Sequence, residues 1–117
     1  IGHDVWVGHG AVIMAGVTVA SGAIVGGNAM VTRDVPAYHI AAGNPARVVG
    51  MRFAEKVAAD LLASEWWELP YAALCTLERS DPIAFAAAAR SLRVAAQPAN
   101  YPTATLYRRR LVSISGV

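Results

Sequence analysis

The sequence lacks several features that would place it in other protein classes. It has one cysteine, Cys75, so no internal disulfide can form, which favours a reducing, cytoplasmic location. No apolar run reaches about eighteen residues, and the sequence therefore predicts no membrane span and no membrane partner. The net charge of +2 is small and dispersed, which argues against nucleic acid as a partner. At 117 residues, the chain is one domain or part of one.

An aliphatic residue returns at every sixth position near the start of the chain. Cut from Ile1, the sequence reads IGHDVW, VGHGAV, IMAGVT, VASGAI, VGGNAM and VTRDVP. The first column is Ile1, Val7, Ile13, Val19, Val25 and Val31; the fifth is Val5, Ala11, Val17, Ala23, Ala29 and Val35. A period of six fits neither a helix nor a strand, and self-similarity at a fixed short period indicates a solenoid.

We therefore predict a parallel β-helix, in which the first column points inward and the fifth lies near tight corners. The alternative is a β-sandwich rich in valine and glycine, but sandwich strands alternate and keep no sixfold register.

The sixfold register ends after Val35 and Pro36, and the composition then changes. Gly43-Asn44-Pro45 indicates a turn in a last partial coil, which gives a β-helical part over residues 1–50. Helices are predicted at 53–64, 71–77 and 83–94, the last with Asp81 as N-cap and Pro82 at its first position. We expect residues 51–96 to form a helical cap that covers the open end of the prism, with Trp66 and Trp67 in its packing. Residues 97–117, with the run Arg108–Arg110, are expected to form a disordered tail.

Three motifs resemble the hexapeptide-repeat acyltransferases: IGHDVWVG, GGNAMVTRDVPAY and AAGNPARVV. The resemblance covers residues 1–53. Arg52–Phe53, a helix and SEWWELP are similar to the xenobiotic branch, which acetylates chloramphenicol and streptogramins. The resemblance implies an all-β solenoid, the left-handed parallel β-helix, with three hexapeptides to a coil. In such a three-faced coil, residues six apart lie on different faces, whereas residues eighteen apart stack. His3 and His9 are therefore not expected to form a metal site, and no metal is predicted. It also implies a homotrimer that holds CoA between neighbouring prisms, for which Val12, Ile24 and Met30 are candidate interface residues.

The chemistry implied by this resemblance is direct transfer of acetyl from acetyl-CoA to a hydroxyl. Such a transfer needs a base and donors for the oxyanion. The family's catalytic histidine is expected upstream of Ile1, so no catalytic residue is assigned within this sequence. Two coils are also few for a solenoid, and a fragment is expected. His3 is expected at a solvated corner, His39 in a structural role, and Cys75 is not expected to be a nucleophile.

Cofactor recognition is better represented in the sequence. The implied cofactor-binding residues are Trp6, His9, Gly26, Gly27, Thr32, Arg33 and Arg47. Gly26 and Gly27 offer bare main chain to the amides of CoA, and Arg33 and Arg47 offer guanidinium groups to its phosphates. Trp6 and His9 match positions that border the groove, and Thr32 with Arg33 matches a Thr-Lys pair of many relatives. The alternatives are that the glycines only make turns and that the arginines are only solvated.

Two functions follow from this sequence. The first is the C-terminal part of an acetyl-CoA-dependent O-acetyltransferase that acts on a hydroxylated small molecule such as chloramphenicol or a streptogramin, inactive as an isolated 117-residue chain. The second is a non-catalytic hexapeptide solenoid that binds CoA or a partner chain.

Overall fold

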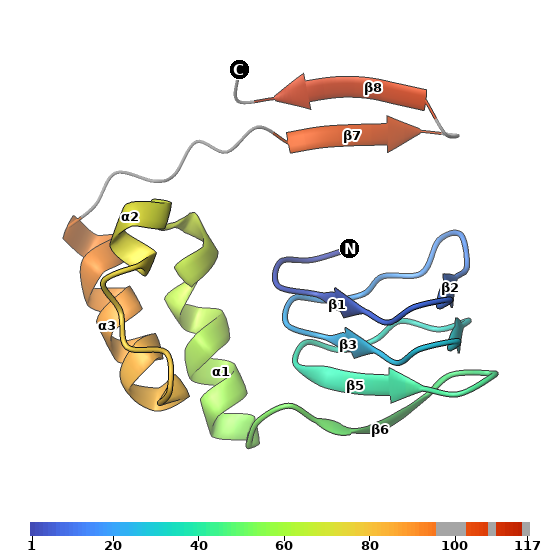
Figure 1. The fold of residues 1–117 in the computed structure, drawn as a ribbon, viewed down its shortest axis with the longest axis horizontal. Helices are drawn as coiled ribbons and strands as arrows, with labels where there is room; N and C mark the ends of the chain where they lie inside the picture. Colours follow the sequence, from blue (N-terminus) through green and yellow to red (C-terminus); the bar gives the residue numbers. More distant parts are fainter. Residues whose placement is uncertain (96–102, 108–109, 116–117) are drawn as a thin grey trace.

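The computed structural model describes residues 1–95, 103–107 and 110–115. Its first part is a stack of short strands: β1 (Trp6–Val7), β2 (Val12–Ile13), β3 (Ile24–Val25), β4 (Met30–Val31), β5 (His39–Ala42) and β6 (Arg47–Met51). Its second part contains α1 (Glu55–Ser64), the 3-10 helix η1 (Trp66–Glu68), α2 (Tyr71–Leu74) and α3 (Pro82–Ala95). Figure 1 shows the helices standing beside the stacked strands.

The strands stack in parallel with the spacing that three hexapeptides require. Trp6 pairs with Ile24 on one face, and Val12 pairs with Met30 on a second face, both eighteen residues apart. An isolated parallel bridge between Val19 and Val35 marks a third face. The prediction that residues eighteen apart stack is confirmed.

The second coil is shorter than the first, and one predicted column is wrong there. Ile24 pairs with Ile40, and Val19 pairs with Val35, in each case sixteen residues apart. Val35 therefore continues the first column under Val19, not the fifth column to which the sixfold cut assigned it. The hexapeptide that begins at Val31 is two residues short. Its compact turn is held where the Thr18 N–H donates to Asp34 Oδ1 at 2.7 Å.

The fourth position of each hexapeptide is a corner in the left-handed backbone region. The corner residues are Asp4 (φ 51°), Gly10 (69°), Gly16 (82°), Gly22 (74°), Asn28 (55°) and, after the shortened turn, Tyr38 (55°). Asp4, Gly22 and Tyr38 follow one another down the same corner of the stack.

The inward columns form the first core. Val19, Val25, Val31 and Val35 are buried together with Ala23, Ala29, Ala41 and Ala46. Val5, Ala11, Ile13 and Val17 of the upper coil pack against this cluster and are partly buried. Ile1 and Val7, at the upper end of the stack, are 72% and 43% exposed. The inward direction of the first column is thus seen most clearly in its lower members.

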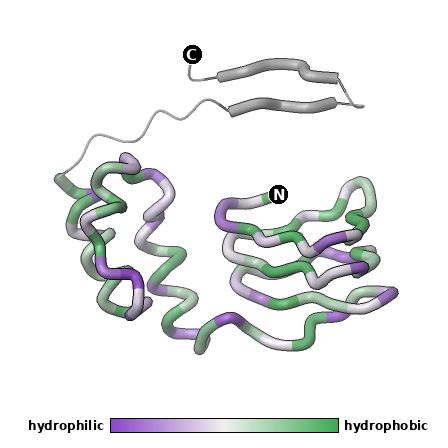
Figure 2. The backbone as a smooth tube through the Cα atoms, in the orientation of Figure 1, coloured by the Kyte–Doolittle hydropathy of each residue, from purple (hydrophilic) through white to green (hydrophobic). Residues whose placement is uncertain are grey.

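Strand β6 lies at the other end of the stack and runs antiparallel to β5, with the turn predicted at Gly43-Asn44-Pro45 between them. The helices lie alongside the coils, where Tyr38 forms a second core with Ala58, Leu61 and Ala86. The predicted position of the helices across the end of the prism is therefore not what the structure shows. Figure 2 shows apolar segments in both parts of the chain.

The predicted helices are present with shifted ends. α1 begins two residues later than predicted, α2 ends at Leu74 instead of Leu77, and η1 was not predicted. α3 begins as predicted, because Asp81 Oδ1 accepts from the N–H groups of Ile83 and Ala84 at 2.9 and 3.3 Å.

The region of the predicted tail contains two described strands. β7 (Thr103–Tyr107) and β8 (Arg110–Ser115) pair antiparallel. Residues 96–102, 108–109 and 116–117 lie outside the described residues, and so do two arginines of the run Arg108–Arg110. The prediction of disorder over residues 97–117 stays a prediction for the segments that are not described, whereas the two described segments are strands.

Candidate cofactor-binding site

The first group of predicted site residues forms where two turns stack. His9 lies directly above Gly27, and the His9 carbonyl accepts from the Asn28 N–H at 2.8 Å. Gly8, just before His9, is required by packing, since a Cβ there would lie 2.5 Å from the nitrogen of Gly27. The structure thus brings His9, Gly26 and Gly27 together, as their spacing in an eighteen-residue coil implies.

Gly26 and Gly27 differ in whether packing and hydrogen bonding explain a glycine at their position. A Cβ at Gly26 would lie 3.1 Å from Ala42 Cβ, its N–H donates to the Ala41 carbonyl, and its own carbonyl accepts from Ala29. Turn formation and packing therefore explain Gly26, so its role as bare main chain for a cofactor gains no support from the geometry.

Gly27 is exposed, and packing does not explain it. A Cβ there would make only an ordinary contact with the His9 carbonyl oxygen at 3.4 Å, and its φ lies outside the left-handed region. Within the described residues its N–H and C=O have no backbone hydrogen bond. Gly27 therefore presents an open donor and an open acceptor on a surface that no side chain covers, which is the arrangement that an amide-containing ligand arm can use.

The second group lies at the lower end of the stack. Arg33 and Arg47 line one hollow of about 190 Å³, although the first follows β4 and the second begins β6. Asp34 lines the same hollow. Arg47 Nη1 donates to the Ala46 carbonyl at 2.9 Å, and neither arginine has an ion pair within the described part of the chain. Two arginines thus line one space together with a single acidic residue, and guanidinium groups suit phosphate oxygens.

The remaining predicted cofactor residues are more separate. Thr32 is exposed beside Arg33. Trp6 is 68% exposed on β1, in register with Ile24 and then Ile40 on the same face. Within the described residues, no hydrogen bond or ring contact joins Trp6 to the other predicted cofactor residues.

The histidines and the cysteine differ in their surroundings. His3 is exposed at its turn, as predicted, and its ring also stacks on Trp67, with centroids 4.9 Å apart and planes within 5°, a contact that was not predicted. His39 Nδ1 donates to the Ala37 carbonyl at 2.8 Å, in keeping with a structural role. Cys75 is exposed. The described residues contain no group of three or more His, Cys, Asp or Glu side chains able to hold a metal ion.

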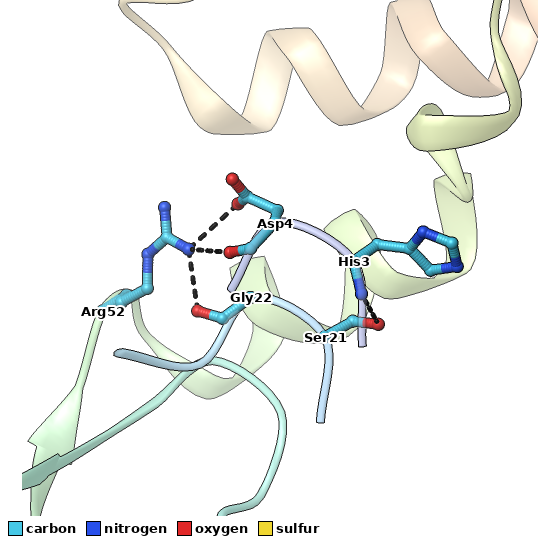
Figure 3. Close-up of polar contacts among 5 residues, drawn as sticks. All are labelled: His3, Asp4, Ser21, Gly22 and Arg52. Atoms are coloured by element: carbon cyan, nitrogen blue, oxygen red, sulfur yellow. Dashed lines mark hydrogen bonds and ion pairs between the residues drawn. The ribbon is translucent and has the colours of Figure 1, made fainter. Parts of the chain in front are cut away.

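A cluster of hydrogen bonds around Arg52, which the sequence did not predict, lies where the coils meet the helices. Arg52 Nη1 donates to the Gly22 carbonyl at 2.7 Å, to Asp4 Oδ2 at 2.9 Å and to the Asp4 carbonyl at 3.3 Å (Figure 3). Its guanidinium carbon also lies 5.5 Å from the ring centroids of Tyr38 and Phe53. The eighteen-residue spacing of Asp4 and Gly22 could have placed these two residues at one corner of the coils. No spacing in the sequence indicates that Arg52 would bind them.

Within the described residues, no helix is both long and apolar enough to cross a membrane.

The coils described above lie in a region of the chain that is similar in sequence to known proteins. Residues 1–33 match the family of the bacterial transferase hexapeptide, with six repeats. A chloramphenicol acetyltransferase of Agrobacterium fabrum is 49% identical over 70 residues, which are 60% of this chain and 34% of that protein. A probable macrolide acetyltransferase of Lysinibacillus sphaericus is 43% identical over 67 residues, or 57% of this chain and 37% of that protein.

Among solved structures, galactoside acetyltransferase in complex with coenzyme A is 40% identical to this chain. The match covers 43% of this chain and 25% of that one, with a TM-score of 0.42. The chain spans about a third of the length of the curated relatives it matches. Its repeat and its sequence relatives together make the chain similar to the hexapeptide-repeat acetyltransferases.

Proposed function

We propose that the chain is the CoA-binding part of an acetyl-CoA-dependent O-acetyltransferase whose acceptor is a hydroxylated small molecule such as chloramphenicol or a streptogramin. Its fold would then be a left-handed parallel β-helix with helices packed alongside the coils. The likeness to chloramphenicol and macrolide acetyltransferases supports the substrate class. The observation that carries the proposal is Gly27, an exposed glycine that neither packing nor backbone conformation requires.

Each predicted contact has a distinct task in this proposal. The Gly27 N–H and C=O bind amides of the pantetheine arm, and His9 lies beside that arm. Arg33 and Arg47 bind phosphate oxygens from the hollow that they share. Bound acetyl-CoA supplies the thioester from which acetyl is transferred, while the chain orients the cofactor along the coil. Gly26 shapes the turn, and Trp6 and Thr32 remain candidates at the border of the groove.

The general base is proposed to lie outside this sequence. His3 is stacked on Trp67, and the His39 Nδ1–H is taken by a carbonyl. His9 is exposed, and no hydrogen bond of its ring is recorded within the described residues. A base needs both reach and orientation, and none of these three imidazoles is held by a carboxylate in the part of the chain described. The same observation favours the second candidate function, a non-catalytic solenoid that binds CoA or a partner chain.

The proposed homotrimer requires an apolar outer face. Val12 and Met30 lie in register on the face formed by β2 and β4, and Val12 is among the exposed large hydrophobic residues. Ile24 lies on the adjacent face, in register with Trp6. An interface built from all three residues would therefore wrap around one edge of the prism. Light scattering coupled to size-exclusion chromatography measures the oligomeric state directly.

The test of CoA binding compares two open glycines. Gly50 resembles Gly27 in that its φ is not in the left-handed region and a Cβ would clash with nothing: at Gly50 no atom lies within 4 Å, and at Gly27 the His9 carbonyl oxygen is at 3.4 Å. We expect Gly27→Ala to weaken CoA binding about tenfold in isothermal titration calorimetry, because a main-chain hydrogen bond to the ligand is obstructed. Gly50→Ala is expected to bind as the parent does. Equal affinities for the parent and Gly27→Ala would contradict the proposal.

A second measurement separates the two functions. Release of free thiol from acetyl-CoA in the presence of chloramphenicol is expected to be absent for the 117-residue chain, even where CoA binds. Thiol release by this chain would show that a base lies within the sequence. If a longer chain that contains an upstream histidine loop also binds CoA without releasing thiol, the solenoid function is preferred.

A further inference from the structure

A second hollow, larger than the one at Arg33 and Arg47, lies between the helices and the corner of the coils. Its volume is about 470 Å³, within the range of small-molecule sites. Apolar side chains form most of its wall: Phe53, Leu61, Trp66, Leu74 and Phe85. None of its lining residues is among the predicted cofactor contacts, so the hollow is separate from the proposed CoA site. An apolar wall of this kind suits a flat, aromatic body.

The buried phenol of Tyr38 gives this hollow an unused donor. Tyr38 lines the hollow and is only 1% exposed, and its hydroxyl has no hydrogen-bond partner within the described residues. A buried hydroxyl without a partner costs stability, so such groups are rare and call for an explanation. An oxygen acceptor on a ligand in the hollow would satisfy the Tyr38 O–H.

Positive charge at the same wall favours an anionic acceptor. Arg52 uses one terminal nitrogen for Asp4 and Gly22, and Figure 3 shows its other terminal nitrogen pointing away from these partners. Arg79 also lines the hollow and forms no ion pair within the described residues. The neighbouring carboxylate of Glu78 accepts from the N–H groups of Arg79 and Ser80. Asp4, the only acidic residue among the lining residues, is already paired with Arg52.

We propose that this hollow binds an aromatic carboxylate. The ring lies against the wall formed by Phe53, Trp66 and Phe85, and the carboxylate accepts hydrogen bonds from Tyr38 Oη and from the free guanidinium nitrogens of Arg52 and Arg79. The site belongs to the junction of coils and helices, and it does not depend on the proposed transfer of acetyl groups.

The test uses 1-naphthoate as the probe and 1-naphthylmethylamine as its matched cation, both titrated into the full chain. We expect saturable binding of 1-naphthoate with a Kd on the order of 0.1 mM, given the efficiency of small ligands. Binding should shift the indole ¹H–¹⁵N resonance of Trp66 and leave CoA binding unchanged. The amine should bind at least about tenfold more weakly, because it cannot accept from Tyr38 or pair with arginine. An amine that binds as well as the acid would overturn the proposal.

Three variants locate the site. Tyr38→Phe keeps the ring and removes the donor, and Arg79→Gln removes an exposed charge. Each is expected to weaken 1-naphthoate about tenfold. Arg90→Gln changes another exposed arginine, on α3 and outside the lining residues, and should have no effect. Unchanged affinity in Arg79→Gln contradicts the proposal even if Tyr38→Phe does not fold, and a Trp66 resonance that never shifts contradicts the location.

Discussion

The coils and the helices of this chain are held together in different ways. In the coils, side chains are small and the backbone of one turn bonds to the next, as where Trp6 N–H donates to the Ala23 carbonyl at 3.0 Å and Gly8 N–H to Val25 at 2.7 Å. In the helical part, aromatic rings make many of the contacts. The rings of Trp66 and Phe85 pack edge to face, with their centroids 5.8 Å apart. A repeat can specify the first kind of structure with one residue per column, whereas the second depends on particular pairs of side chains.

The two parts meet at one corner, and the largest effect is expected there. At Gly22, φ is +74° and a Cβ would lie 2.5 Å from the ring of Tyr38, which packs against the helices. We expect Gly22→Ala to lower the free energy of unfolding by about 3 kcal/mol, because backbone strain and overpacking add. The measurement is chemical denaturation of the full chain.

The matched control for this corner is Gly16→Ala. Gly16 has a φ of +82°, but a Cβ there meets nothing within 4 Å, so only the backbone strain of about 1 kcal/mol remains. If the two variants lose equal stability, contact with Tyr38 does not matter at Gly22, and the corner is no more sensitive than any other turn.

A smaller effect is expected for Arg52, which connects both parts. Arg52→Gln removes three hydrogen bonds from one nitrogen, and the pair is partly exposed, with 23% of the Arg52 and 35% of the Asp4 side chain accessible. We expect a loss of about 1–2 kcal/mol in the free energy of unfolding. Amide hydrogen exchange should show loss of protection in α1 and α3 before the coils.

The control for Arg52 is Lys56→Gln, which breaks the exposed pair of Lys56 with Asp60 within α1. Pairs of this kind stabilise a helix by a few tenths of a kcal/mol at most. If Arg52→Gln lowers the free energy of unfolding by as little as Lys56→Gln does, the hydrogen bonds of Arg52 to Asp4 and Gly22 do not hold the coils and the helices together.

Much of the coil structure could be predicted, since the period of six gives the columns, and the resemblance to coils of three hexapeptides gives the faces and their stacking. The same eighteen-residue coil places His9 above Gly27. It does not predict the two residues missing after Val31, because VTRD followed by VP still reads as a complete hexapeptide. The placement of Val35 was wrong for that reason.

The contacts beyond the shortened turn could not be read from spacing. Arg33 and Arg47 share a hollow only because β6 turns back against β5. The difference between Gly26 and Gly27 depends on Ala42, which the shorter second coil brings under Gly26. The stack of His3 on Trp67 joins residues from the two parts of the chain, and no local pattern encodes it.

The smallest expected effect concerns the Tyr38 hydroxyl, which lies where the coils meet the helices. Its contribution to the free energy of unfolding should depend on pH. Burial raises the pKa of Tyr38 above its ordinary value of 10.0, although the neighbouring Trp66 side chain opposes part of the shift. The unfolded phenol therefore ionises first, and the free energy of unfolding falls as pH rises from about 10 towards the raised pKa. Below that window, Tyr38→Phe should leave stability unchanged or raise it by at most about 1 kcal/mol, since it removes an unpartnered hydroxyl.

The test is urea unfolding of the parent and of Tyr38→Phe between about pH 8 and pH 11, a range that includes the ordinary pKa of a phenol. Tyr71 is present in both proteins, so its titration cancels in the difference. The two stability curves should coincide in slope up to about pH 10 and diverge above it, with the parent falling faster. Curves that stay parallel would mean that the Tyr38 hydroxyl reaches water or a partner in the folded protein, and the junction would then lack the buried donor assigned to it.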